Sequence, residues 1–173
     1  IQISDGSILY SATYDGQGGN QRLVASQSLT LNSAAVGTRM LAQGRAGNIF
    51  VQADSLELGA GADRSLLLSQ AATGSTGRAG NLTVRANQIA LSGGSRLETA
   101  TFGTGRGGNL VIRAENLEVS GFYPRRIRDL NGDNQPEKIG EVTTGISAQA
   151  ERSAGAEAGN AGRITIQTDR LVV

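Results

Sequence analysis

The sequence predicts an all-β fold, a right-handed parallel β-helix of about six coils with three short strands in each coil. Three observations support this prediction. A glycine-rich motif ending in Asn returns along the chain, apolar residues follow each copy at the same offsets, and no segment shows helical periodicity. The right-handed sense is the one found for nearly all parallel crossover connections. We expect one domain over residues 1–173, since this length suits a single core.

The repeated motif is GxxGN. It ends at Asn20, Asn48, Asn81 and Asn109, and Arg163 takes the Asn position in a fifth copy. The separations between successive copies are 28, 33, 28 and 54. A phosphate-binding loop would need a helix after the motif, whereas the residues here alternate as they do in a strand. We therefore expect each copy to lead from the third strand of one coil into the first strand of the next.

Turn chemistry explains the composition of the motif. Glycine allows a positive φ or a tight bend, and asparagine tolerates the left-handed region while it bonds to nearby backbone. Stacked asparagines are also expected to bond to one another or to the turn above. The predicted turn residues are Gly19, Asn20, Gly47, Asn48, Gly80, Asn81, Gly108, Asn109 and Gly162.

Apolar residues after each motif define the first two strands of a coil. In one unit, Ile49, Val51 and Ala53 lie on one face of a first strand, and Leu56 and Leu58 belong to a second strand beyond a short corner. The equivalent positions of the later units hold Leu82, Val84, Ala86, Ile89 and Leu91, then Leu110, Ile112, Ala114, Leu117 and Val119, then Ile164, Ile166, Thr168, Leu171 and Val173. These residues are the predicted core.

A third strand with small residues closes each coil, in LYSAT from Leu9, LETAT from Leu97 and ISAQA from Ile146. The first unit fits the pattern less well, because Gln21 stands at an apolar position. In a stack, each side chain would lie about 4.8 Å above its equivalent in the preceding coil, so like side chains would form ladders.

Two units are longer than the rest. The unit between Asn48 and Asn81 has its extra residues around GAGADRS and TGSTG, which are both turn-like. The longest unit contains the stretch 122–145, which we expect to be a loop insertion between coil strands. Its Phe122 and Tyr123 either contact a partner or fold back over the coil beneath. Insertions in solenoids often carry function.

A calcium site is a further hypothesis within this insertion. Asp129, Asn131 and Asp133 stand at every second position, with Glu137 behind them, as in calcium loops where hard oxygen ligands converge. Asn134 stands where such loops have glycine, and a solvated Asn/Asp/Gly loop explains the same residues. No other cofactor is expected.

Composition and charge exclude several functions. The chain has no Cys and no His, so disulfides and thiol catalysis are excluded. The formal net charge is +1 and the charged residues look scattered along the sequence, so we expect no polybasic surface and no nucleic-acid partner. No stretch approaches the ~18 apolar residues of a membrane-spanning helix.

Outward-facing polar residues also align in columns. One column holds Asp54, Asn87, Glu115 and Asp169, and another holds Arg85 and Arg113 between Gln52 and Gln167. We expect these columns to form a salt-bridged solvent face without catalysis. The alternative is a polysaccharide lyase or glycosidase, since enzymes of that kind place carboxylates beside a groove.

The sequence also resembles a known family. GNLTVRANQIALSGGSRLETATFGTGRGGNLVIRAENLEVSG and GISAQAERSAGAEAGNAGRITIQTDRL are similar to the repeat region of large filamentous-haemagglutinin-like exoproteins, especially cyanobacterial ones. The resemblance covers nearly the whole chain outside 122–145. It implies a right-handed β-helix, export through an outer-membrane transporter by two-partner secretion, and a secreted or cell-surface rod that is often an adhesin.

The expected function is therefore that of a rod segment in a secreted or cell-surface exoprotein, with a surface glycan or protein as a possible ligand. The chain begins and ends in strand-like sequence, so we expect a piece of a longer rod whose targeting signal lies outside it. Adjoining coils of that rod would then be its nearest partners. Strand edges at both ends would favour end-to-end association unless they are covered.

Overall fold

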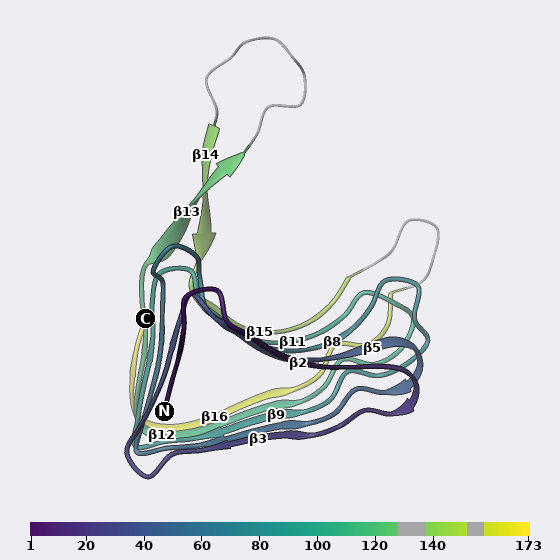
Figure 1. Ribbon diagram of the computed structural model, residues 1–173, viewed down its shortest axis with the longest axis horizontal. Coiled ribbons are helices and arrows are strands. Elements are labelled where there is room, and N and C mark those ends of the chain that lie inside the picture. The colour runs from purple at the N-terminus through teal and green to yellow at the C-terminus, as the bar shows by residue number, and fades with distance from the viewer. Residues whose placement is uncertain (128–137, 152–157) are drawn as a thin grey trace.

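The computed structural model describes residues 1–127, 138–151 and 158–173. The described residues form strands and turns, without a helix. Parallel strands from successive coils stack on one another and build a three-sided solenoid, seen down the stack in Figure 1. The predicted parallel β-helix is confirmed.

The first face of the solenoid follows the GxxGN motifs. Its strands are β3 (Gln21–Val24), β6 (Ile49–Gln52), β9 (Leu82–Arg85), the first half of β12 (Leu110–Val119) and the first half of β16 (Ile164–Val172). They pair in parallel in this order. The alternation of apolar and polar residues directs one side of each strand inward.

The second face begins after a short corner. It contains β1 (Gln2–Ser4), β4 (Ser28–Asn32), β7 (Ser55–Gly59), β10 (Gln88–Leu91) and the second halves of β12 and β16. The third face contains β2 (Ile8–Gln17), β5 (Ala35–Arg45), β8 (Leu66–Ala71), β11 (Arg96–Thr101) and β15 (Gly145–Ala150). In β12 and β16 the chain passes from the first face to the second within one strand, so these coils differ from the predicted three short strands.

Four complete coils have a strand in all three faces, and partial coils lie at both ends. The prediction of about six coils was too high, because every copy of the repeat pattern was counted as a coil, including the two end units that do not close. The two middle coils, β6–β7–β8 and β9–β10–β11, have the predicted three short strands.

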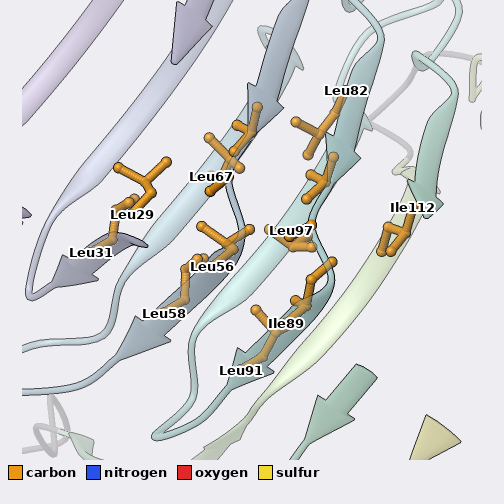
Figure 2. Packing of buried hydrophobic residues seen from close by; sticks show 14 of the residues in the cluster. Leu29, Leu31, Leu56, Leu58, Leu67, Leu82, Ile89, Leu91, Leu97 and Ile112 are labelled. Carbon is orange, nitrogen blue, oxygen red and sulfur yellow. The ribbon is translucent and has the colours of Figure 1, made fainter. Parts of the chain in front are cut away.

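The predicted core pattern is confirmed in the stacked coils. Val51 pairs in register with Val84, and Val84 with Ile112, and all three are fully buried. Figure 2 shows how leucine and isoleucine side chains of successive coils fill the interior level by level. Burying each such side chain contributes about 1.5–3 kcal/mol. In the last unit Ile164 and Ile166 are both 39% exposed, because β16 pairs only with β12.

The extra residues of the unit between Asn48 and Asn81 lie where the sequence places them. In the pairing of this coil with the next, Leu58 lies opposite Leu91, Leu67 opposite Leu97, and Leu82 opposite Leu110. The sequence separation of the paired residues decreases at each of these steps. Residues are therefore inserted before and after β8, in the two turns that contain GAGADRS and TGSTG.

The insertion between the second and third faces is a β-hairpin. Its arms are β13 (Phe122–Ile127) and β14 (Lys138–Thr143), which pair antiparallel and project from one corner of the solenoid (Figure 1). The hairpin closes onto the coil where the Thr144 backbone N–H donates to the Gly121 carbonyl at 3.1 Å. The rest of the stack continues in register past it, since β11 pairs with β15.

Candidate anion-binding groove

The corner between the third and first faces is built by the GxxGN motif. The backbone N–H of Asn48 donates to Asn20 Oδ1 at 2.8 Å, and that of Asn81 donates to Asn48 Oδ1 at 2.9 Å. Asn109 bonds to Asn81 at 2.9 Å and Arg163 to Asn109 at 3.0 Å in the same way. Each asparagine oxygen therefore accepts from the backbone of the next coil, at a place where the chain turns between strands.

The fourth residue of the motif is glycine because two backbones meet there. A Cβ on Gly47, Gly80, Gly108 or Gly162 would collide with the carbonyl oxygen of the equivalent glycine one coil earlier. None of these residues has a positive φ; in the motif that conformation occurs at the first glycine of two copies, such as Gly44, with φ 114°. Of the two predicted reasons, a positive φ or a tight bend, the first therefore does not apply to these four glycines. Close stacking of the coils replaces it as the physical cause.

Buried hydroxyl groups hold the same corner from inside. Thr38 Oγ1 donates to the Gly47 carbonyl at 2.7 Å, and Thr99 Oγ1 donates to the Gly108 carbonyl at 2.6 Å. Ser69 Oγ accepts from the Gly80 N–H at 2.8 Å. These hydroxyl residues come from β5, β8 and β11 on the third face, and each is fully buried. The sequence showed only that this strand carries small residues, so these contacts were missed.

Outside this corner, arginines gather into a groove. Arg45, Arg78 and Arg106 occupy the second position of three motif copies, and Arg163 occupies the Asn position of the fifth. All four are exposed and line one cavity of about 610 Å³. Asn81, Asn109 and Asn160 are among the other lining residues. We call this cavity the arginine groove.

None of the described residues that line the arginine groove is acidic. In the described part of the chain the single ion pair joins Arg96 to Glu98, so no described carboxylate lies within 4.0 Å of a groove arginine. The prediction that the basic residues form no clustered surface is therefore wrong. Residues one repeat apart in sequence become neighbours once the coils stack. The arginine in each GRxGN copy was the signal that could have revealed this.

The groove arginines form a column along the stack. Arg45 and Arg78 are bridge partners, and the Ala79 N–H donates to the Arg106 carbonyl at 2.9 Å. Adjacent strands lie about 4.8 Å apart, so the Cα atoms of successive groove arginines lie at that spacing. Like charges directly opposite each other destabilise a sheet. An anion in the groove would reverse this repulsion through charge-assisted hydrogen bonds.

The chemistry available in the groove is binding. A guanidinium group remains protonated in proteins and donates five hydrogen bonds in a planar fork. The other described lining residues are asparagine, alanine and glycine, and none of these side chains is a nucleophile or a general base.

A second depression of about 680 Å³ lies farther along the first face. It is lined by Arg85 and Arg113 together with Glu115 and Asp169. The arginines align in register as predicted, but they do not form the predicted salt bridges. Arg113 Nε donates instead to Gln167 Oε1 at 2.8 Å, and the Arg85 guanidinium lies 5.6 Å from the centre of a phenylalanine ring.

The predicted acidic column lies along this second depression. Asn87 Nδ2 donates to Asp54 Oδ1 at 2.7 Å, and both side chains are exposed. Glu115 and Asp169 belong to consecutive coils and are also exposed. The structure therefore brings two carboxylates to one depression, which is one feature that the alternative enzymatic hypothesis requires.

The outward side of the third face is concave in Figure 1 and carries a buried acid. Glu98 is only 6% exposed, accepts from Gln70 Nε2 at 3.1 Å and pairs with Arg96 at 3.3 Å. Tyr10 packs over Gly37 on the same side, where a Cβ would approach the tyrosine ring. Burial raises the pKa of the Tyr10 hydroxyl, while the charge of Arg39 acts in the opposite direction. The polar groups of Glu98 are thus occupied within the sheet.

The hypothetical calcium ligands Asp129, Asn131, Asp133 and Glu137 lie outside the described residues. Elsewhere in the described chain, no group of three or more His, Cys, Asp or Glu residues is placed to hold a metal ion. The two aromatic residues at the base of the hairpin behave differently. Phe122 is 51% exposed, whereas Tyr123 Oη donates to the Ala62 carbonyl at 2.7 Å and ties the hairpin to the turn between β7 and β8, two coils earlier.

The part of the chain that the structure describes contains no helix with the length and hydropathy that a membrane crossing requires. In comparisons with known proteins, no family model, curated protein or solved structure matches this chain. The identification that the structure supports is therefore the fold: the chain is a parallel β-solenoid with a hairpin insertion.

Proposed function

We propose that this chain is a rod segment of a secreted or cell-surface exoprotein of the filamentous-haemagglutinin-like type, which extends and displays a binding surface. The observation that supports this proposal is the unbroken pairing of the stack. Each face continues from coil to coil in parallel register, and each motif corner adds an asparagine bond. Export through a two-partner outer-membrane transporter is part of the same proposal.

The physical basis is the direction of the hydrogen bonds. In a solenoid the bonds between coils run along the axis, so a pull along the rod loads many backbone bonds together. The strands of each coil pair only with those of its neighbours, and stability grows with the number of stacked coils. A long, stiff and protease-resistant stalk follows from repeating one marginal unit.

Cell attachment tests this proposal. The chain would be displayed on bacterial cells that lack other adhesins, and retention on glycan-coated surfaces would be measured under flow. We expect the native chain to raise retention and Gly80→Val to abolish the gain, because a side chain at Gly80 collides with the coil beneath. Gly145→Val is the matched control, since nothing lies within 4 Å of a Cβ at Gly145. Equal retention with and without the native chain would contradict an adhesive role.

A carbohydrate-active enzyme is the second candidate, favoured by the two carboxylates in the second depression. Glycoside hydrolases place two carboxyl groups about 5–5.5 Å or about 6.5–9.5 Å apart across the scissile bond. The test measures new reducing ends or unsaturated products after incubation with acidic and neutral polysaccharides. Product formation that disappears in both Glu115→Gln and Asp169→Asn would establish the enzyme and overturn the proposal of a purely displaying rod.

A further inference from the structure

We propose that the arginine groove binds a linear polysaccharide that carries one carboxylate on each sugar. This inference rests on the proposed display function and deepens it by naming the class of ligand. The polymer would lie along the stack axis, with its carboxylates on Arg45, Arg78 and Arg106.

The shape of the groove requires an elongated ligand. Each successive coil presents one arginine, and the strand spacing places the Cα atoms of these arginines about 4.8 Å apart. A small anion could contact only one or two members of this column. A polyuronate carries a charge on every sugar ring, so one chain lying along the axis presents several carboxylates to the column at once.

The lining matches the remaining chemistry of such a polymer. Arginine forks bind carboxylates through two parallel N–H···O bonds. Asn81, Asn109 and Asn160 have side-chain amides that can donate to and accept from sugar hydroxyls. Since the described lining residues include no carboxylate, an incoming anion meets no like charge among them.

Single-stranded nucleic acids fit the groove less well. They bind by stacking bases on aromatic side chains, and none of the described lining residues is aromatic. The second depression is unsuited to any of these polymers, because Glu115 and Asp169 would repel them.

The experiment compares two double variants with the same change in charge. Arg78→Gln/Arg106→Gln removes two groove arginines, and Arg85→Gln/Arg113→Gln removes two arginines of the second depression. In both variants the two arginines lie on consecutive coils and are separated by the same number of residues, so the control is also matched in position. Binding of oligogalacturonate long enough to span three coils would be measured by calorimetry. The neutral control ligand is an oligogalactan of equal length.

We expect the native chain to bind oligogalacturonate more tightly than galacturonate monomer, with affinity that falls as salt rises. The groove variant should lose at least about tenfold in affinity, and the control variant less than about threefold. Circular dichroism should show that both variants keep the β fold.

Four results would overturn the inference. These are no binding by the native chain, equal losses in the two variants, equal affinity for monomer and oligomer, and tighter binding of single-stranded DNA than of oligogalacturonate. Failure of this binding leaves the proposed rod intact, because cell retention is measured separately. Cleavage of the oligomer during the titration would instead overturn the non-catalytic function while the ligand class stands.

Discussion

Gly80 shows how tightly a single residue of this fold is constrained. Its position faces the Gly47 carbonyl of the preceding coil, and a methyl group there would overlap backbone atoms that have nowhere to move. Gly108 and Gly162 repeat this contact in later coils. The recurring glycine of the motif is thus a consequence of stacking, because the same close approach returns whenever a coil is added.

Replacing Gly80 by alanine should therefore destabilise the chain strongly. Overpacking costs about 1–3 kcal/mol in well-packed cores, and we expect about 3 kcal/mol here because the obstacle is backbone. Gly145→Ala is the control, since the space around a Cβ at Gly145 is open, and it should stay within about 1 kcal/mol of the native free energy of unfolding. Urea denaturation measures both. Similar midpoints for the two variants would refute the stacking argument.

The asparagine of the same motif contributes less, because it is exposed. Asn81→Ala removes the oxygen that accepts from the Asn109 N–H, and the expected cost is about 0.5–1.5 kcal/mol. Asn116→Ala is the matched control, because Asn116 is an exposed asparagine on the next coil for which the structure shows no side-chain hydrogen bond. This variant should change the free energy of unfolding by less than about 0.5 kcal/mol. Thermal unfolding distinguishes the two variants. An unchanged midpoint for Asn81→Ala would show that water replaces the lost hydrogen bond between the coils.

At the level of elements, side chains of the third face stabilise the corner at which the chain enters the first face. Thr38, Ser69 and Thr99 are in register on β5, β8 and β11, and their hydroxyl groups reach across the coil to motif backbone. A buried carbonyl without a partner costs free energy, so each hydroxyl matters more than its size indicates.

Thr99→Val tests this bracing while it keeps the side-chain shape. The Gly108 carbonyl would lose its hydroxyl partner, and we expect a loss of about 1–3 kcal/mol. Thr83→Val is the control, because Thr83 is half-buried on the outward side of β9 and makes no hydrogen bond through its side chain in the described structure. It should change the free energy of unfolding by less than about 0.5 kcal/mol. Chemical denaturation of both variants provides the comparison, and equal losses would contradict the assigned role.

The sequence predicted the parts of the fold that depend on local periodicity. Inward positions such as Val84 and Leu91 follow from alternation along one strand, and they are buried as expected. The contact between Thr99 and Gly108 could not be predicted in this way, because it joins two faces across a coil. The arginine groove was missed for a related reason: the charges of Arg78 and Arg106 look scattered until the coils are stacked.

At the level of the whole molecule, the chain behaves as a one-dimensional array. The strands of each coil pair only with the coils on either side, so stability is close to a sum of coil terms and interface terms, and the Tyr123 bond to Ala62 adds one contact that spans two coils. The hairpin leaves the stack at the corner between the second and third faces, away from the corner that holds the arginine groove (Figure 1). An insertion of this size is accommodated because the coil closes beneath it.

Removing one whole coil tests this description. Deleting residues 82–109 joins Asn81 to Leu110, which occupies the same position as Leu82 in its coil. The shortened chain should keep a β-type circular dichroism spectrum and unfold cooperatively at a lower midpoint. A deletion of residues 82–108, which removes one residue fewer, turns the following strand to the wrong face and should fail to fold. If both deletions behaved alike, the coil would not be the structural unit.

The direction of the asparagine bonds has a further consequence. In every motif the acceptor oxygen belongs to the earlier coil and the donor N–H to the later one. A coil that has already formed therefore presents a free acceptor oxygen to the segment that follows it. If folding began at the carboxyl end, a finished coil would present no asparagine oxygen to the segment that precedes it. A chain that emerges amino terminus first could zip up behind its leading end, turn by turn, without waiting for its remainder to appear.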